Sequence, residues 1–92
     1  MNKFELNEAI AKLLSVTPPA MSTGSTESKQ LFVLINETLG LGLDNRLSKP
    51  ILAREIAEIG GLTWNPGCES RGSTVTQAGM QKVHDAVVNL LG

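Results

Sequence analysis

The sequence predicts a single all-α domain of four helices, and three observations lead to this prediction. Four segments repeat their apolar residues at the three- and four-residue spacing of one helical face. Capping residues precede these segments and glycine or proline follows them, so that almost no strand is expected between them. The chain of 92 residues is 41% apolar but only 3% aromatic, which is typical of one small globular domain with an aliphatic core.

The first helix is expected from Lys3 to Leu14. Asn2 is a favourable N-cap, and Glu5 three residues later completes a capping-box pattern. The helix must stop before Pro18-Pro19, because the residue before a proline is pushed out of the α region. Its predicted buried face consists of Leu6, Ile10, Leu13 and Leu14.

The second helix is expected from about Glu27 to Leu39, after a polar loop over residues 20–26. Its centre, residues 31–35, is a run of five apolar residues that periodicity alone could also assign to a strand. A helix is favoured because Ser-Thr-Glu-Ser precedes the run and the pattern continues to a stop at Gly40. The predicted buried residues are Leu31, Phe32, Leu34, Ile35 and Leu39.

The third helix is expected to start after Ser48, with Pro50 in its first turn, where the missing N–H is harmless. Gly60-Gly61 ends it, and a loop over residues 63–73 contains the turn signal Asn65-Pro66-Gly67. The predicted buried residues of this helix are Ile51, Leu52, Ile56 and Ile59.

The fourth helix is expected from Val75 or Gln77 to Leu91, with Thr74 and Gln77 forming a capping box. Gly79 inside it costs up to about 1 kcal/mol relative to alanine, so this helix needs tertiary packing or a close helix contact. Its predicted apolar stripe contains Met80, Val83, Val87, Leu90 and Leu91.

The two halves of the chain are similar to each other. A shift of 48 residues aligns residues 14–28 with residues 62–76, with Leu, Pro, Ser and Gly-Ser-Thr in common. The same shift pairs Phe32 with Met80 and Ile35 with Val83, and the first helix matches the third after a two-residue slip. We therefore expect two helix–loop–helix repeats, residues 3–43 and 49–92, packed about a pseudo-two-fold axis around one core. Chance similarity between two loops rich in Gly, Ser and Thr is the alternative.

Each Gly-Ser-Thr precedes a predicted helix, whose first unpaired N–H groups can bind an anion. Hydroxyl groups would add donors, and glycine would allow close approach of the backbone to a phosphate. These loops are candidate contacts to the phosphates of a nucleic-acid duplex. The alternative is that Ser and Thr only cap the helices. The candidate nucleic-acid-binding residues are Ser22, Gly24, Ser25, Thr26, Ser70, Arg71, Gly72, Ser73 and Thr74.

The charge of the chain counts against strong DNA binding. Eight basic and nine acidic residues give a formal net charge of −1, and neither half carries a basic stripe. A nucleic-acid role would need local clustering, for example of Lys49, Arg54 and Arg71 on one surface. Trp64 is expected to cover the end of the core with its N–H bonded to a carbonyl, or alternatively to anchor an interface.

No catalytic, cofactor or metal motif is present in the sequence. Cys68 and His84 are the only residues of their types, so we expect no enzyme activity in this chain, no cofactor and no structural metal. His84 is expected on an exposed polar flank of its helix and Cys68 at a partly buried position. No apolar run approaches the length needed to span a bilayer, and no signal peptide is evident, so a cytoplasmic protein is expected.

The second half carries Leu62-x-Trp64, Cys68-x-Ser70 and Gly72-Ser73-Thr74-Val75-Thr76 before Gly79-Met80. With these elements the stretch 52–91, about half of the chain, resembles small helical modules found alongside bacterial type II restriction endonucleases and related defence proteins. The Pro-Asp…Asp/Glu-x-Lys arrangement of an endonuclease core is absent. The resemblance therefore implies a non-catalytic DNA-recognition or accessory domain, with duplex DNA as its partner.

A protein–protein interaction or dimerisation module is the alternative function. Val33, Leu41, Leu43 and Val88 can exceed what one small core needs and leave an apolar patch on the surface. The partner would then be a second copy of the chain or another domain of a longer chain, and no membrane would be involved.

Overall fold

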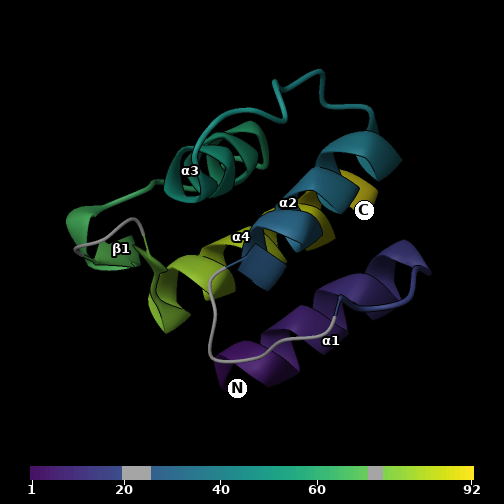
Figure 1. Ribbon diagram of the computed structural model, residues 1–92, viewed down its shortest axis with the longest axis horizontal. Helices are drawn as coiled ribbons and strands as arrows, with labels where there is room; N and C mark the ends of the chain where they lie inside the picture. The colour runs from purple at the N-terminus through teal and green to yellow at the C-terminus, as the bar shows by residue number, and fades with distance from the viewer. Residues whose placement is uncertain (20–25, 71–73) are drawn as a thin grey trace.

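The computed structural model describes residues 1–19, 26–70 and 74–92, without the side chains of residues 26–28. The all-α prediction is correct in outline, because four helices make up most of the described chain (Figure 1). The loop expected over residues 63–73 is wrong in detail, since it contains a short 3-10 helix and one short strand, and the second strand follows it at residues 74–75. The elements in order are α1 Lys3–Leu14, α2 Thr26–Leu39, α3 Lys49–Ile59, η1 Pro66–Cys68, β1 Glu69–Ser70, β2 Thr74–Val75 and α4 Gln77–Leu91.

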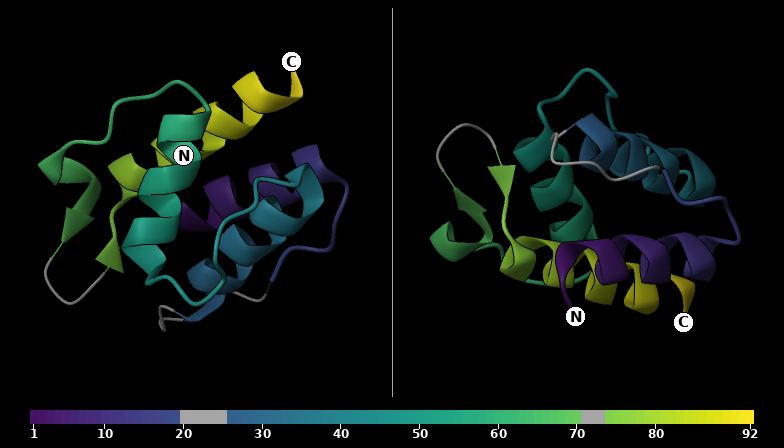
Figure 2. Two further views of the ribbon diagram at one scale, coloured as in Figure 1. Left: turned by 90° about the horizontal axis from the view of Figure 1, so that it is seen from above. Right: turned by 60° about the horizontal axis from the view of Figure 1, so that its bottom comes forward.

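The four helices pack around one another so that each contacts two others (Figure 2). α1 and α4 lie side by side and run in the same direction, and the side-chain amide of Gln77 at the start of α4 donates a hydrogen bond to the carbonyl of Met1 (2.8 Å). α3 packs against α4 on another side, and α2 packs against α3 and α1. Every helix therefore contributes one face to a shared core.

The core is aliphatic except for one aromatic ring, as the composition predicts. Burying each large aliphatic side chain in it stabilises the fold by roughly 1.5–3 kcal/mol relative to leaving that side chain exposed. The largest completely buried side chains are Leu6, Ile10, Leu31, Phe32, Ile35, Leu52, Ile56, Met80, Val83 and Val87.

Three residues predicted to be buried are exposed instead. Leu13, Ile59 and Leu91 have 38%, 43% and 47% of their surface accessible. Each lies in the last turn of its helix. Leu34 and Leu39 of α2, Ile51 of α3 and Leu90 of α4 are half-buried.

The helix boundaries follow the capping signals, with one correction. The capping box of α1 is confirmed: Asn2 Oδ1 accepts from the Glu5 N–H (2.8 Å) and Glu5 Oε1 accepts from the Asn2 N–H (2.9 Å). Ser48 is the N-cap residue of α3, although its hydroxyl makes no capping hydrogen bond. The predicted capping box of Thr74 and Gln77 is wrong, because Thr76 caps α4 by accepting from the Gly79 N–H (3.2 Å).

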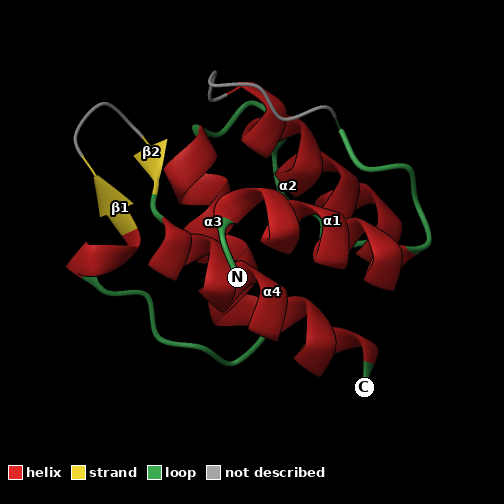
Figure 3. Cartoon of the chain, turned by 90° about the horizontal axis from the view of Figure 1, so that it is seen from below, coloured by secondary structure: helices red, strands yellow, loops and turns green. Residues whose placement is uncertain are grey.

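The two strands explain why α4 starts at Gln77, the later of the two predicted positions. β1 and β2 pair in antiparallel register, with Glu69 opposite Val75 and Ser70 opposite Thr74 (Figure 3). The Thr76 N–H then donates to the carbonyl of Cys68 (3.0 Å), which keeps the chain extended up to that residue. Thr74 is therefore held in a strand and cannot cap the helix.

A buried asparagine fixes the connection between α2 and α3. Asn36, only 6% exposed, donates from Nδ2 to the carbonyl of Leu43 and to Oδ1 of Asn45, and its Oδ1 accepts from the Leu43 N–H, all at 2.8 Å. Gly40 and Gly42 adopt positive φ values of 64° and 74°, which L side chains rarely adopt. The connection is thus folded back onto the end of α2.

Candidate functional site

Most of the residues predicted to contact phosphate lie outside the described part of the chain. This holds for Ser22, Gly24, Ser25, Arg71, Gly72 and Ser73. Thr26 is the first residue of α2, so it lies at a helix N-terminus as predicted, and its side chain is not described. Ser70 and Thr74 are paired residues of β1 and β2 and do not belong to the first turn of a helix. The predicted symmetry between the two Gly-Ser-Thr loops is therefore incorrect for Thr74, and the other phosphate contacts stay predictions.

The predicted cationic cluster is also not supported at two of its three positions. Lys49 is only 8% exposed, at the start of α3, where it offers little charge to a partner. The Arg54 guanidinium lies 3.5 Å from the carboxylate of Glu55, and the third residue, Arg71, is among those not described.

A further cation, Arg46, is engaged by its own loop. Its Nε and Nη2 each donate to the Asp44 carboxylate at 3.2 Å, and its backbone N–H donates to the same group at 2.9 Å. The hydrogen bond from the Arg46 side chain, followed by the one from its backbone, lowers the pKa of Asp44, and the charge of Lys29 adds a smaller lowering. The exposed Arg46 charge is therefore partly neutralised.

Trp64 packs partly against the core and partly against the β1–β2 hairpin. Its indole Nε1 donates to Glu69 Oε1 (2.9 Å), so the predicted carbonyl partner is wrong and a carboxylate takes its place. Trp64 and Glu69, together with Arg54, Asn65 and Pro66, line a shallow pocket of about 450 Å³. The indole is thus fixed by a hydrogen bond and half-buried. Its role as an interface anchor stays a prediction.

Cys68 and His84 have local partners. Cys68 is buried more completely than predicted, with 1% of its surface accessible, and its Sγ lies 3.5 Å from Asn65 Oδ1. His84 Nδ1 lies 3.0 Å from Asp85 Oδ1, and its side chain is 19% exposed, less than an exposed flank would be. No group of three or more potential metal ligands occurs within residues 1–19, 26–70 and 74–92. In the same ranges no helix has the length and apolar content needed to cross a membrane.

A concave surface lies on the outer side of α2, and we call it the α2 groove. It has a volume of about 650 Å³, within the 300–1,000 Å³ usual for ligand sites. Residues of the α1–α2 connection form one wall, and a stripe of α2 at positions i, i+1, i+4 and i+5 forms the other. The lining residues are Thr17, Pro18, Pro19, Lys29, Gln30, Val33 and Leu34.

The position of the groove follows from the way α2 is buried. Leu31, Phe32 and Ile35 point into the core and are completely buried. The residues beside them, Val33 and Leu34, are therefore left half-buried on the flank that the α1–α2 connection faces. Sequence reasoning named Val33 as a surplus apolar residue but missed the groove, because nothing local to α2 indicates that Pro18-Pro19 lies opposite.

Comparisons with models of protein families, with curated proteins and with solved structures found no match to this chain. The resemblance of the second half to modules of restriction and defence proteins therefore stays a hypothesis.

Proposed function

We propose that the protein is a non-catalytic interaction module that binds a segment of a partner protein in the α2 groove. The observation that carries this proposal is an open, apolar, concave surface of about 650 Å³ built from two segments of the chain. Grooves of this kind bind apolar side chains of helical or extended peptides.

Both walls of the α2 groove are held in a fixed conformation before a partner binds. Proline fixes its own φ, so Pro18 and Pro19 restrict the backbone of one wall before any partner arrives. The opposite wall is a helix whose inner face is anchored by completely buried Leu31, Phe32 and Ile35. A surface that is already ordered loses less conformational entropy on binding, which favours affinity.

This proposal is tested by selecting random displayed peptides on the protein and locating them from amide chemical shifts. We expect shifts concentrated at Thr17 and along Lys29–Leu34. A near-isosteric change, Val33→Thr, replaces a methyl by a hydroxyl in the groove and should weaken binding about fivefold, corresponding to about 1 kcal/mol. Val88→Thr on the exposed side of α4 is the matched control and should leave affinity unchanged. Shifts that map elsewhere, or equal affinities for the two variants, would contradict the proposal.

A second candidate function is recognition of duplex DNA as an accessory domain of a restriction or defence system. It is supported by the resemblance of residues 52–91 and by the register of the hairpin, which places Ser70 opposite Thr74 on either side of Arg71, Gly72 and Ser73. Fluorescence anisotropy with duplex DNA at several salt concentrations tests it. Affinity should fall with salt and with Arg71→Ala. Absence of binding at low salt excludes this function for the chain.

We also infer that the two helix pairs descend from one duplicated unit arranged about a pseudo-two-fold axis. Matching positions agree in burial: Leu6 and Leu52, Ile10 and Ile56, and Phe32 and Met80 are all completely buried, whereas Leu13 and Ile59 are both exposed. A two-fold exchange would also turn the contact of α1 with α4 into that of α3 with α2, and both contacts exist. In an experimental structure the helix pairs α1–α2 and α3–α4 should superpose. A different crossing angle in the two pairs would refute duplication as the origin.

A further inference from the structure

We propose that the protein forms a weak symmetric dimer in which the α1 helices of two copies lie antiparallel against each other. The surface that pairs is formed by Glu5, Glu8, Lys12 and Leu13 of α1 with Val88 and Leu91 of α4, and we call it the α1–α4 face. None of these residues lines the α2 groove, so this inference goes beyond the proposed function and does not depend on it.

Exposed apolar side chains are concentrated on α1 and α4. Of the six large apolar side chains that are exposed in the described part of the chain, five belong to these two helices or to the residues directly before α1. They are Met1, Phe4, Leu13, Val88 and Leu91, with between 38% and 57% of their surface accessible, and the sixth is Ile59 of α3. Single exposed apolar residues are common on monomers, whereas a group of them on two adjacent helices is typical of a surface that contacts another protein.

The parallel packing of α1 and α4 sorts these residues to the two ends of one surface. The side-chain hydrogen bond from the first residue of α4 to Met1 aligns the starts of the two helices, and both helices run in the same direction (Figure 2). Leu13, Val88 and Leu91 therefore lie at the shared C-terminal end. Met1 and Phe4 lie at the N-terminal end, so the surface is apolar at both ends.

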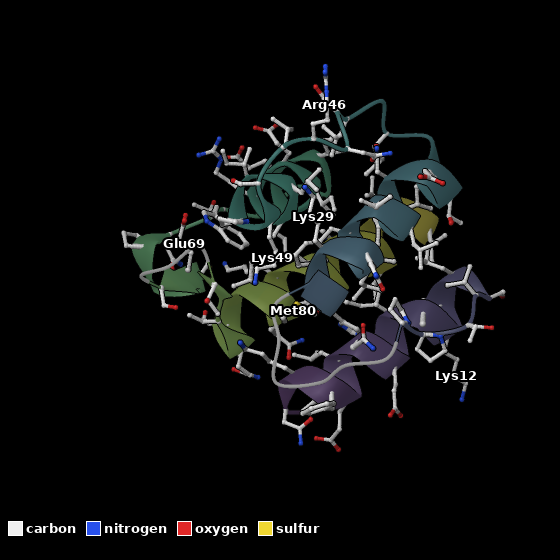
Figure 4. The ribbon with its side chains drawn as sticks, viewed as in Figure 1. Lys12, Lys29, Arg46, Lys49, Glu69 and Met80 are labelled. Atoms are coloured by element: carbon white, nitrogen blue, oxygen red, sulfur yellow. The ribbon has the colours of Figure 1, made fainter. Side chains whose placement is uncertain are left out.

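Between the apolar ends, α1 carries charges of opposite sign along one stripe. Glu5, Glu8 and Lys12 follow the three- and four-residue spacing of one helical face, and all three side chains are exposed. Lys12 points outward from the last turn of α1 (Figure 4). α4 adds one half-buried charge of each sign, Lys82 and Asp85, so α1 sets the charge pattern of the face.

A second copy of the same face matches both features. When two α1 helices lie antiparallel about a two-fold axis with residue 8 opposite residue 12, Lys12 of each copy faces Glu8 of the other, and Glu5 lies about one turn away. The two-fold axis makes this ion pair occur twice. The same alignment brings the apolar N-terminal end of one copy to the apolar C-terminal end of the other. Two parallel α1 helices would instead oppose like charges, so charge complementarity selects the antiparallel pair.

The size of the face predicts a weak dimer. At 1.5 Å per residue α1 and α4 are about 18 Å and 22 Å long, and two adjacent helices are about 20 Å wide. A face of roughly 400 Å² is smaller than the about 800 Å² per partner of a standard stable interface. We therefore expect a dissociation constant of about 100 µM, with mostly monomer at low micromolar concentration.

Sedimentation velocity over a range of protein concentrations at low salt tests the ion pair, after circular dichroism has established that each variant is folded. Glu8→Lys and Lys12→Glu should each weaken the dimer at least tenfold, because like charges then face each other. An equimolar mixture of the two variants should dimerise at least as well as wild type, since opposite charges face each other again. Lys29→Glu on α2, away from Lys12 (Figure 4), is the charge-matched control and should leave the dissociation constant unchanged.

Leu13→Gln tests the apolar end of the face and should weaken the dimer about tenfold. Ile59→Gln is its matched control, because Ile59 is exposed to a similar extent in the last turn of α3 and lies outside the face. Wild type that remains monomeric at about 1 mM in low salt contradicts the inference. A dimer that Lys12→Glu and Leu13→Gln leave intact contradicts it as well, since that dimer uses a different surface.

Discussion

The helix pairs α1–α2 and α3–α4 differ in how the core is filled at one pair of matching positions, residue 31 and residue 79. Leu31 of α2 is completely buried and fills its part of the core with its own side chain. The 48-residue register pairs it with Gly79 of α4, which has no side chain. A Cβ added at Gly79 would collide with the carbonyl oxygen of Cys68 and lie 2.7 Å from Val75 Cγ1 and 3.0 Å from Trp64 Cη2.

The difference shows that the connecting segment replaces the missing side chain. In α2 the side chain of Leu31 is itself completely buried, whereas at Gly79 of α4 the space of a side chain is taken by atoms of Trp64, Cys68 and Val75. Glycine is required at 79 because another part of the backbone occupies the space of its Cβ. Gly79 is unfavourable for the helix itself, but it allows the hairpin to pack against α4.

The largest effect is expected for Leu31→Ala. Removing a completely buried leucine leaves a cavity, so the free energy of unfolding should fall by about 3.5 kcal/mol. The urea-unfolding midpoint measures this change, and Leu13→Ala on the exposed end of α1 is the control, with a small loss. Equal losses at the two positions would show that α2 is not anchored as described.

Gly79→Ala should destabilise the protein by about 2.5 kcal/mol, because inserting a methyl group into a packed contact forces the backbone apart. Alanine is otherwise the better helix former, so an unpacked α4 would be stabilised by this change. Gly67→Ala is the matched control, since its added Cβ meets only Asn65 Oδ1 at 3.4 Å. If Gly79→Ala leaves the urea-unfolding midpoint unchanged or raises it, the space beside residue 79 is not filled as described, and the two helix pairs do not differ at this position.

Asn36→Ala should cost about 2 kcal/mol, because it removes a buried side chain whose hydrogen bonds hold the part-buried N–H and carbonyl of Leu43. The register pairs Asn36 with His84, whose polar contact is with Asp85 on its own helix. His84→Ala should therefore cost less than about 1 kcal/mol. The thermal unfolding midpoints of the two variants measure this difference. Similar shifts for both variants would show that Asn36 and His84 stabilise their halves equally.

The smallest change in folding stability is expected when Asp44 is protonated at low pH. The pKa of Asp44 is lowered in the folded chain, so this carboxylate stabilises the protein above its ordinary pKa of about 4 and the contribution is lost as pH falls through the folded value. Solvent screens the exposed pair with Arg46, so the contribution is small. The stability difference between wild type and Asp44→Asn should narrow from pH 7 to pH 3, and a widening difference would contradict the assignment.

The helices could be predicted from the sequence because their signals are local. Asn2 and Glu5 cap α1, Gly60 ends α3, and each apolar stripe extends over several turns. The hairpin could not be predicted in this way, since strands of two residues have no measurable periodicity. The sequence pattern predicts Thr74 as the cap of α4, and the pairing of β1 with β2 explains why Thr76 takes this position instead.

The candidate site was less predictable for the same reason. The surplus of apolar residues was evident, and Val33 was named among them, but a groove needs two walls. Its second wall, Pro18-Pro19, was interpreted only as a helix stop. Asn36 gave no signal either, because a buried asparagine is recognised by the loop it binds and not by its neighbours in the chain.

The position of Trp64 allows intrinsic fluorescence to report on the hairpin. The sequence contains one tryptophan and no tyrosine, so intrinsic fluorescence comes from a single indole, which is held between Glu69 and the start of α4. Its emission should follow detachment of the hairpin, whereas circular dichroism follows the four helices. Two unfolding curves that coincide would mean that the hairpin and the helices open as one cooperative unit, and a fluorescence transition at lower denaturant would identify the hairpin as the first part to leave.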